Sequence, residues 1–110
     1  MTIHITGRHI EITKGLRDYI EEKISHLSKL FERPLDVHVV LLEEHGEKIA
    51  EANLNTPHFP TIHAHGNSSD MYASIDIMVD RLKSQIQKDK EKSLDRRDHK
   101  IHGNQESFED

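Results

Sequence analysis

Polar and apolar residues alternate in several stretches of the chain, and this period of two predicts β-strands with one covered face. The stretches are residues 2–6, 35–42, 48–55 and 61–65. The run LDVHVVLL at 35–42 is almost continuously apolar, so we expect a central strand that is covered on at least one face. Gly7 ends the first stretch, a turn at 43–47 follows the second, and Pro57 and Pro60 bracket the next turn.

Two further segments repeat their apolar residues at helical spacing. The first begins after Thr13, a residue type that favours helix N-caps, and ends at Pro34. Its apolar stripe consists of Leu16, Ile20, Ile24, Leu27 and Phe31. The second begins after the turn-forming residues 66–70. Its stripe consists of Tyr72, Ile75, Val79, Leu82 and Ile86.

The connections between these elements predict the fold class. A helix between the first two strands allows a parallel crossover, whereas the short later turns require antiparallel hairpins. We therefore predict an α+β fold: a single βαβββα domain with a four-stranded mixed sheet and two helices packed on one face. The domain spans residues 1–94, and residues 95–110 lack the periodicity and apolar surface that would offset their ordering entropy. We expect a flexible, disordered C-terminal tail there.

Composition narrows the possible functions. The chain has no cysteine, which excludes disulfides, thiolate metal sites and thiol nucleophiles. It has no phosphate-binding Gly-rich loop, no HExxH motif and no nucleophile elbow, so we expect neither an enzyme nor a cofactor. No stretch has the length of a membrane span or the apolar core of a signal peptide, which predicts a cytoplasmic protein without membrane contact.

The distribution of charge matters more than its sum. The formal net charge of -5 argues against nucleic-acid binding, but residues 80–100 carry a net +3, which leaves -8 for the rest. Within that segment, Arg81, Gln85, Lys88 and Lys92 follow helical spacing in one stripe that is separate from the apolar stripe. Such a stripe is typical both of a solvated helix face and of a phosphate-binding face, and spacing alone does not decide between them.

Ten histidines are unusual in a chain of 110 residues. His4, His38, His63 and His65 fall on the predicted open face of the sheet, where pairs of imidazoles can capture a divalent transition metal. Structural zinc sites, however, use closed sets of four ligands with characteristic spacing. We therefore predict no functional metal site and regard these four histidines as candidates for adventitious metal binding only.

Three segments resemble the ribosome hibernation promoting factor family: ITG at 5–7, EIT at 11–13 and, most specifically, DMYASID at 70–76. The resemblance covers roughly residues 1–93 and implies the same βαβββα order. It further implies binding to rRNA of the small ribosomal subunit in the channel for mRNA and tRNA. The expected results are inhibition of translation and formation or modulation of inactive ribosome dimers.

The resemblance also implies which residues bind rRNA. The family's basic positions match the following residues of this sequence: Arg17, Lys23, Arg33, Arg81, Lys88, Lys90 and Lys92. The implied partners are 16S-type rRNA and neighbouring ribosomal proteins, bound by a protein that is monomeric in solution. The chain length favours a short family member without a second, dimerising domain. Two alternative functions remain open: a general double-stranded-RNA-binding domain and a histidine-based metal-binding protein. The role of the tail in ribosome pairing also remains open.

Overall fold

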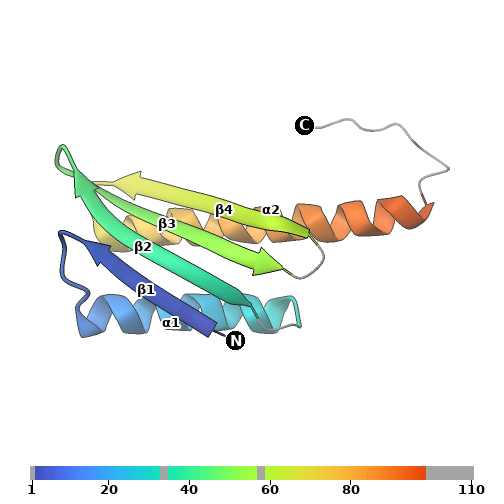
Figure 1. The fold of residues 1–110 in the computed structure, drawn as a ribbon, viewed down its shortest axis with the longest axis horizontal. Helices are drawn as coiled ribbons and strands as arrows, with labels where there is room; N and C mark the ends of the chain where they lie inside the picture. The colour runs from blue at the N-terminus through green and yellow to red at the C-terminus, as the bar shows by residue number, and fades with distance from the viewer. Residues whose placement is uncertain (1, 33–34, 57–58, 99–110) are drawn as a thin grey trace.

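The computed structural model describes residues 2–32, 35–56 and 59–98; of residues 56, 59 and 89–98 it describes the backbone alone. Its elements follow one another in the predicted order (Figure 1). They are β1 (Thr2–Arg8), α1 (Lys14–Leu30), β2 (Asp36–Glu44), β3 (Glu47–Thr56), β4 (Phe59–Ser68) and α2 (Met71–Asp98). The predicted α+β fold with the order βαβββα is therefore confirmed.

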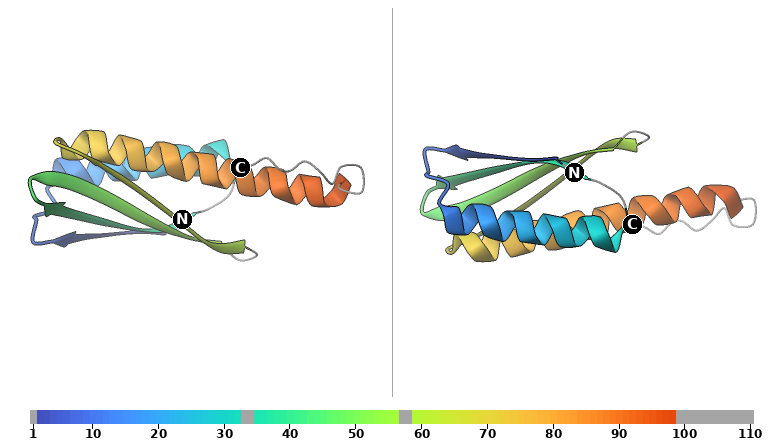
Figure 2. Two further views of the ribbon diagram at one scale, coloured as in Figure 1. Left: turned by 90° about the horizontal axis from the view of Figure 1, so that it is seen from above. Right: turned by 90° about the horizontal axis from the view of Figure 1, so that it is seen from below.

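The four strands form one mixed sheet in the order β1-β2-β3-β4. β1 pairs with β2 in parallel, and the other two pairs are antiparallel, as the lengths of the connections predict. Both helices cover the same face of this sheet (Figure 2). The opposite face, here called the open face, carries the polar residues of the alternating strands.

The core lies between the sheet and the two helices. Of the stripe predicted for α1, Leu16, Ile20, Ile24 and Leu27 are buried, and Phe31 is the C-cap residue and is partly buried against the core. The predicted stripe of α2 is wrong at Tyr72, which is 39% exposed. Its neighbour Met71 is buried instead, and successive helical residues are turned by about 100°. Two residues that the pattern did not include, Ser74 and Met78, are fully buried with it.

The strands run further than the alternation predicted. β2 continues to Glu44, so the hairpin turn is only His45 and Gly46, whose φ values of 52° and 82° suit a two-residue loop. Pro60 lies within β4, where an edge strand tolerates proline. Gly66 also lies within β4 rather than in a turn. A Cβ atom there would come within 2.4 Å of the carbonyl oxygen of Ser74, so this glycine permits the close approach of α2.

α2 is the longest element and extends beyond the sheet and beyond the end of α1 (Figures 1 and 2). Its backbone is helical to Asp98, past the predicted domain boundary at residue 94. Residues 99–110 of the predicted tail lie outside the described residues, as do Arg33, Pro34 and Pro57. Among the described helices, none combines the length and apolarity that a membrane crossing requires.

Candidate nucleic-acid interface

The two helices lie side by side and run in the same direction. The ring of Tyr19 on α1 meets that of Tyr72 on α2 edge to face, with centroids 5.0 Å apart. Four residues further along both helices, Lys23 faces Asp76. Equal steps on both helices mean that they are parallel, and these contacts define a seam between them. The helices thus present one continuous layer on the side of the molecule away from the open face.

Asp76 holds the seam together. The hydroxyl of Tyr19 donates a hydrogen bond to Oδ1 of Asp76 at 2.6 Å, and Nζ of Lys23 lies 3.5 Å from the same oxygen. That hydrogen bond raises the pKa of Tyr19. Burial lowers the pKa of Lys23, but the neighbouring Asp76 and Tyr19 outweigh it and raise the pKa overall. The charge of Lys23 is therefore already partly neutralised within the protein.

The DMYASID segment fixes the start of α2. Oδ1 of Asp70 accepts a hydrogen bond from the backbone N–H of Tyr72 at 3.3 Å, which caps the helix. The hydroxyl of the fully buried Ser74 donates to the carbonyl of Lys48 at 2.6 Å and so ties α2 to β3. Asp76 ties the same turn to α1. The motif that carries the family resemblance thus positions α2.

The predicted basic residues are not on one surface. Arg17 is exposed and lies about 120° around α1 from Lys23, on the flank away from α2. Arg81 and Lys88 are exposed and lie about 140° and 120° around α2 from Asp76, on the flank away from α1. The structure therefore brings Arg81 and Lys88 together on one outer flank of the layer and separates them from Arg17. Of Lys90 and Lys92 only the backbone, within α2, is described.

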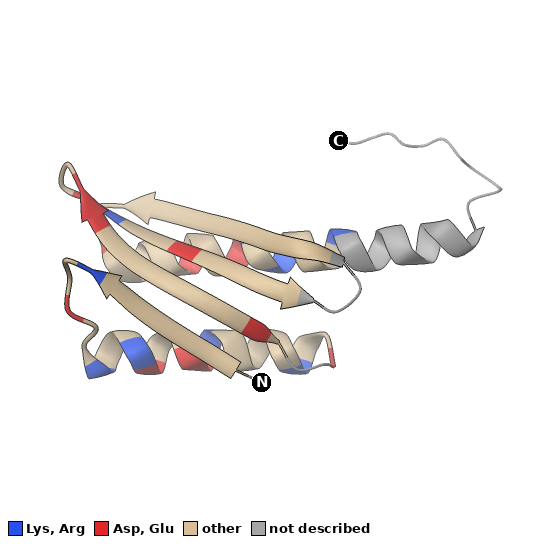
Figure 3. Ribbon diagram, viewed as in Figure 1, with Lys and Arg blue, Asp and Glu red and all other residues tan. Residues whose placement is uncertain are grey.

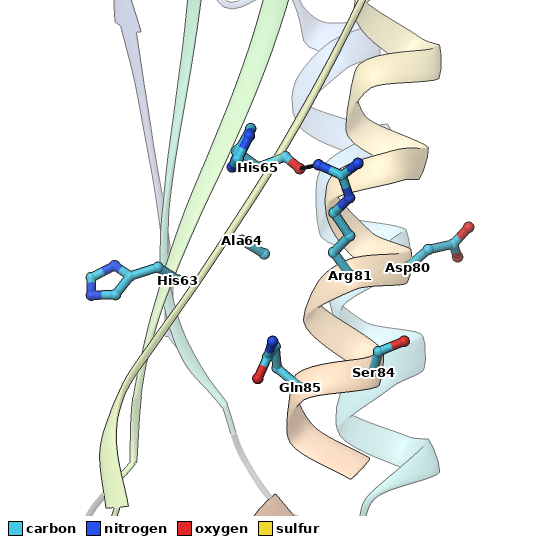
Figure 4. A pocket seen from close by; sticks show the side chains of 7 residues that line it. All are labelled: His63, Ala64, His65, Asp80, Arg81, Ser84 and Gln85. Atoms are coloured by element: carbon cyan, nitrogen blue, oxygen red, sulfur yellow. Dashed lines mark hydrogen bonds between the residues drawn. The ribbon is translucent and has the colours of Figure 1, made fainter. Parts of the chain in front are cut away.

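Arg81 spans a shallow groove of about 340 Å³ between α2 and the edge strand β4 (Figure 4). One guanidinium N–H donates to the carbonyl oxygen of His65 at 2.8 Å. Gln85 projects toward the strand, while the ring of His63 points away from the helix. A guanidinium has five N–H donors in a planar fork. Arg81 is thus held in place and keeps donors for a second partner.

Asp80 also lines this groove beside Arg81, whereas three other acidic residues gather away from it. Glu43, Glu44 and Glu47 lie at the β2–β3 hairpin (Figure 3), and α2 extends past the sheet at the other end of the molecule (Figure 1). One cation that spacing did not single out, Lys83, is exposed and falls seven residues after Asp76. It therefore lies close to the line of the seam. The spacing of seven residues between Asp76 and Lys83 is visible in the sequence. That Asp76 faces α1, and that Lys83 therefore lies near the seam, is visible only in the structure.

The four histidines lie on the open face as predicted. In the register of the sheet, His4 on β1 lies opposite His38 on β2. His38 lies opposite Asn53 on β3, which in turn lies opposite His63 on β4, so these four residues form one row. His65 belongs to the next row. In the described part of the chain, no group of three or more His, Cys, Asp or Glu residues could hold a metal ion.

This arrangement, an α+β domain with two parallel helices on one face of a mixed sheet, has known counterparts. The family model described as "Sigma 54 modulation protein / S30EA ribosomal protein" matches residues 3–94. A ribosome hibernation promoting factor of Klebsiella oxytoca is 41% identical over 84% of this chain and 96% of its own. That of Azotobacter vinelandii is 38% identical over 87% of this chain and 89% of its own.

Solved structures agree with the sequence comparison. The N-terminal domain of Protein Y from Thermus thermophilus has a TM-score of 0.72 at 34% identity, over 80% of this chain and 98% of that one. A ribosomal subunit interface protein from Coxiella burnetii has a TM-score of 0.73 at 29% identity, over 82% and 98%. The chain belongs to the ribosome hibernation promoting factor family. Members of this family are modulation factors rather than enzymes, and the prediction of a non-enzymatic protein is confirmed.

Proposed function

We propose that this protein is a ribosome hibernation factor that binds rRNA of the small ribosomal subunit in the channel for mRNA and tRNA. Relatives that are 41% and 38% identical to it carry the name ribosome hibernation promoting factor. Occupying that channel inhibits translation by occlusion, without a covalent step. Such a role would place the protein in the cytoplasm, as a monomer that associates with ribosomes.

The exposed cations on a rigid helix layer carry this proposal. Arg81 and Lys88 lie on one flank of α2, and neither forms an ion pair with another residue whose side chain the structure describes. Folded RNA presents closely spaced phosphates, and contacts to them orient a protein without reading sequence. The helix fixes the spacing of the residues that carry these cations, and the hydrogen bond to His65 positions the guanidinium of Arg81, which reduces the ordering that binding requires.

The remaining predicted residues contribute unequally. Arg17 lies on the outer flank of α1 and reaches a different part of the channel wall from Arg81. Lys23 is a weaker contact because Asp76 already neutralises part of its charge. Arg33, Lys90 and Lys92 complete the proposed rRNA-binding set on the strength of the family resemblance.

Binding to purified bacterial small subunits, large subunits and a plain RNA duplex tests the proposal. We expect a labelled protein to bind small subunits at least tenfold more tightly than the duplex, and mRNA or tRNA to compete with it. Equal affinity for the duplex would instead support a general double-stranded-RNA-binding domain. Treatment with a chelator should leave binding unchanged, and a loss of binding would support the histidine-based metal protein.

A further inference from the structure

The open face of the sheet carries a row of imidazoles that the proposed helix contacts do not use. His4, His38, Asn53 and His63 lie opposite one another across all four strands. Neighbouring strands are about 4.8 Å apart, so the row spans roughly 14 Å. The helices pack on the other face, and His4, His38 and His63 are all exposed. We call these three residues the histidine row.

The contacts within the histidine row leave room for additional protons. Nδ1 of His63 contacts Oδ1 of Asn53, so Nδ1 carries the hydrogen and Nε2 is available. Nε2 of His38 lies 2.9 Å from the hydroxyl of Thr6, which can donate to a neutral ring or accept from a charged one. The rings of His4 and His38 are 6.2 Å apart, edge to face.

Protonation reverses the charge of the middle of this face. The row next to the histidine row contains Thr6, Val40, Glu51 and His65. With neutral imidazoles these two rows carry -1, from Glu51, and with four imidazolium groups they carry +3. The other charged groups on the open face lie toward its ends: Asp36 at one end, and Arg8, Glu44 and Glu47 at the other. Histidine side chains ordinarily titrate near pH 6.5, within the range that cells reach.

We propose that the open face forms a second contact with rRNA. In this contact the histidine row binds phosphates of the rRNA backbone, and it binds them more tightly as the pH falls. This inference rests on the proposed function, because a protein lodged in an RNA-walled channel meets phosphates on both sides. The helix layer contacts one wall and leaves the open face toward the other. Imidazolium donates charge-assisted hydrogen bonds to phosphate oxygens, whereas neutral imidazole does so only weakly.

A divalent metal ion is the competing occupant, and pH separates the two. Metal ligation requires neutral imidazoles, so metal-dependent binding weakens as the pH falls. Phosphate binding by imidazolium strengthens over the same range. The described residues hold no cluster of three ligands suited to a metal, which favours phosphate.

The test measures the affinity of the full chain for purified small subunits at pH 7.8 and pH 5.8, with and without a chelator. The variant H4Q/H38Q/H63Q keeps the polarity of the histidine row but cannot gain protons. The matched control H9N/H26Q/H45N removes three exposed histidines from outside the open face. It uses asparagine at 9 and 45 because both backbones have positive φ, which asparagine tolerates. Thermal unfolding confirms that all three proteins fold.

We expect the wild type and the control to bind about tenfold more tightly at pH 5.8, the effect of a few surface ion pairs. The row variant should show at most a twofold change and should match the wild type at pH 7.8. Equal pH dependence in the row variant and the wild type would overturn the open-face contact while leaving the proposed function intact. If affinity instead decreases as the pH is lowered, and is lost when the chelator is added, the histidine row binds a metal ion. Failure of all three proteins to bind small subunits at either pH would overturn the proposed function itself.

Discussion

At the scale of single residues, Gly66 sets how closely α2 approaches the sheet. A Cβ atom at this position would lie 2.4 Å from the carbonyl oxygen of Ser74 and 2.8 Å from the backbone nitrogen of Met78. Both are backbone atoms of the helix, so the helix itself must shift. We expect Gly66→Ala to lower the free energy of unfolding by about 1–3 kcal/mol, as overpacking does in other cores. Urea denaturation measures this loss.

Gly46 provides the matched control. It lies in the turn between β2 and β3, where a Cβ atom would meet none of the described residues within 4 Å, and only its φ of 82° restricts substitution. Asparagine tolerates such a backbone, so Gly46→Asn should change the free energy of unfolding by less than about 1 kcal/mol. Equal losses in the two variants would contradict the close approach of α2 at Gly66.

A substitution of Lys88 tests the proposed contact between α2 and rRNA phosphates most directly. Lys88 is exposed on the outer flank of α2, two residues after Ile86, the last described core residue of that helix. Lys88→Glu should weaken small-subunit binding by about tenfold, because a favourable phosphate contact becomes repulsive. The slope of log affinity against log salt should become shallower by about 0.7–0.9 for the lost phosphate contact. Salt titration against purified subunits measures both quantities.

Lys14→Glu is the control for Lys88→Glu, because it replaces the same residue type and changes the net charge by the same amount. Lys14 is the first residue of α1, is exposed, and already pairs with Asp18 at 2.6 Å. Lys14→Glu should therefore leave the salt slope within error of the wild type. If it lowers affinity as much as Lys88→Glu does, binding depends on net charge alone rather than on the flank of α2.

At the scale of elements, Asp76 couples the two helices through the seam. Asp76→Ala removes the acceptor of Tyr19 and the partner of Lys23, whereas Tyr19→Phe removes only the donor. We expect a coupling energy of about 0.5–1.5 kcal/mol between the two positions in a double-mutant cycle, the range of one hydrogen bond. The contribution of the Lys23 pair should be small, because both of its side chains are about half-exposed. A coupling energy near zero would mean that the seam does not stabilise the fold.

The seam also predicts a dependence of stability on alkaline pH. The pKa values of Tyr19 and Lys23 are raised above 10.0 and 10.5, so the folded state holds these protons more tightly than the unfolded state. The resulting stability is fully present below about pH 10 and is lost as the pH rises through the folded-state values. Between pH 9 and 11.5, the unfolding free energy of Asp76→Ala should thus fall less steeply than that of the wild type. Parallel curves would contradict this assignment.

The elements themselves were largely predictable, because each strand and helix buries one face and the period of its apolar residues is visible in the sequence. The seam was not predictable. Tyr72 fits the helical stripe by spacing, but its position next to Met71 and across from Tyr19 depends on how α2 sits against α1. Gly66 was misread for a similar reason, since a glycine that makes a turn and a glycine that admits a helix look alike in sequence. The division of the basic residues into separate flanks likewise follows from helix orientation.

At the scale of the whole molecule, the last residues of the chain should contribute neither to folding nor to small-subunit binding. The described core ends at Ile86, so deletion of residues 99–110 should leave thermal unfolding cooperative, with a midpoint within about 2 °C of the full chain. Small-subunit affinity should also persist, because the proposed contacts precede residue 99.

Sedimentation of ribosomes with each form then isolates the effect of the deleted segment. A change in the fraction of paired ribosomes at equal subunit occupancy would assign to that segment the choice between ribosome dimers and inactive single ribosomes. Identical sedimentation profiles would show instead that the domain of residues 1–98 decides it, and a lost folding transition would show that the domain extends beyond Asp98.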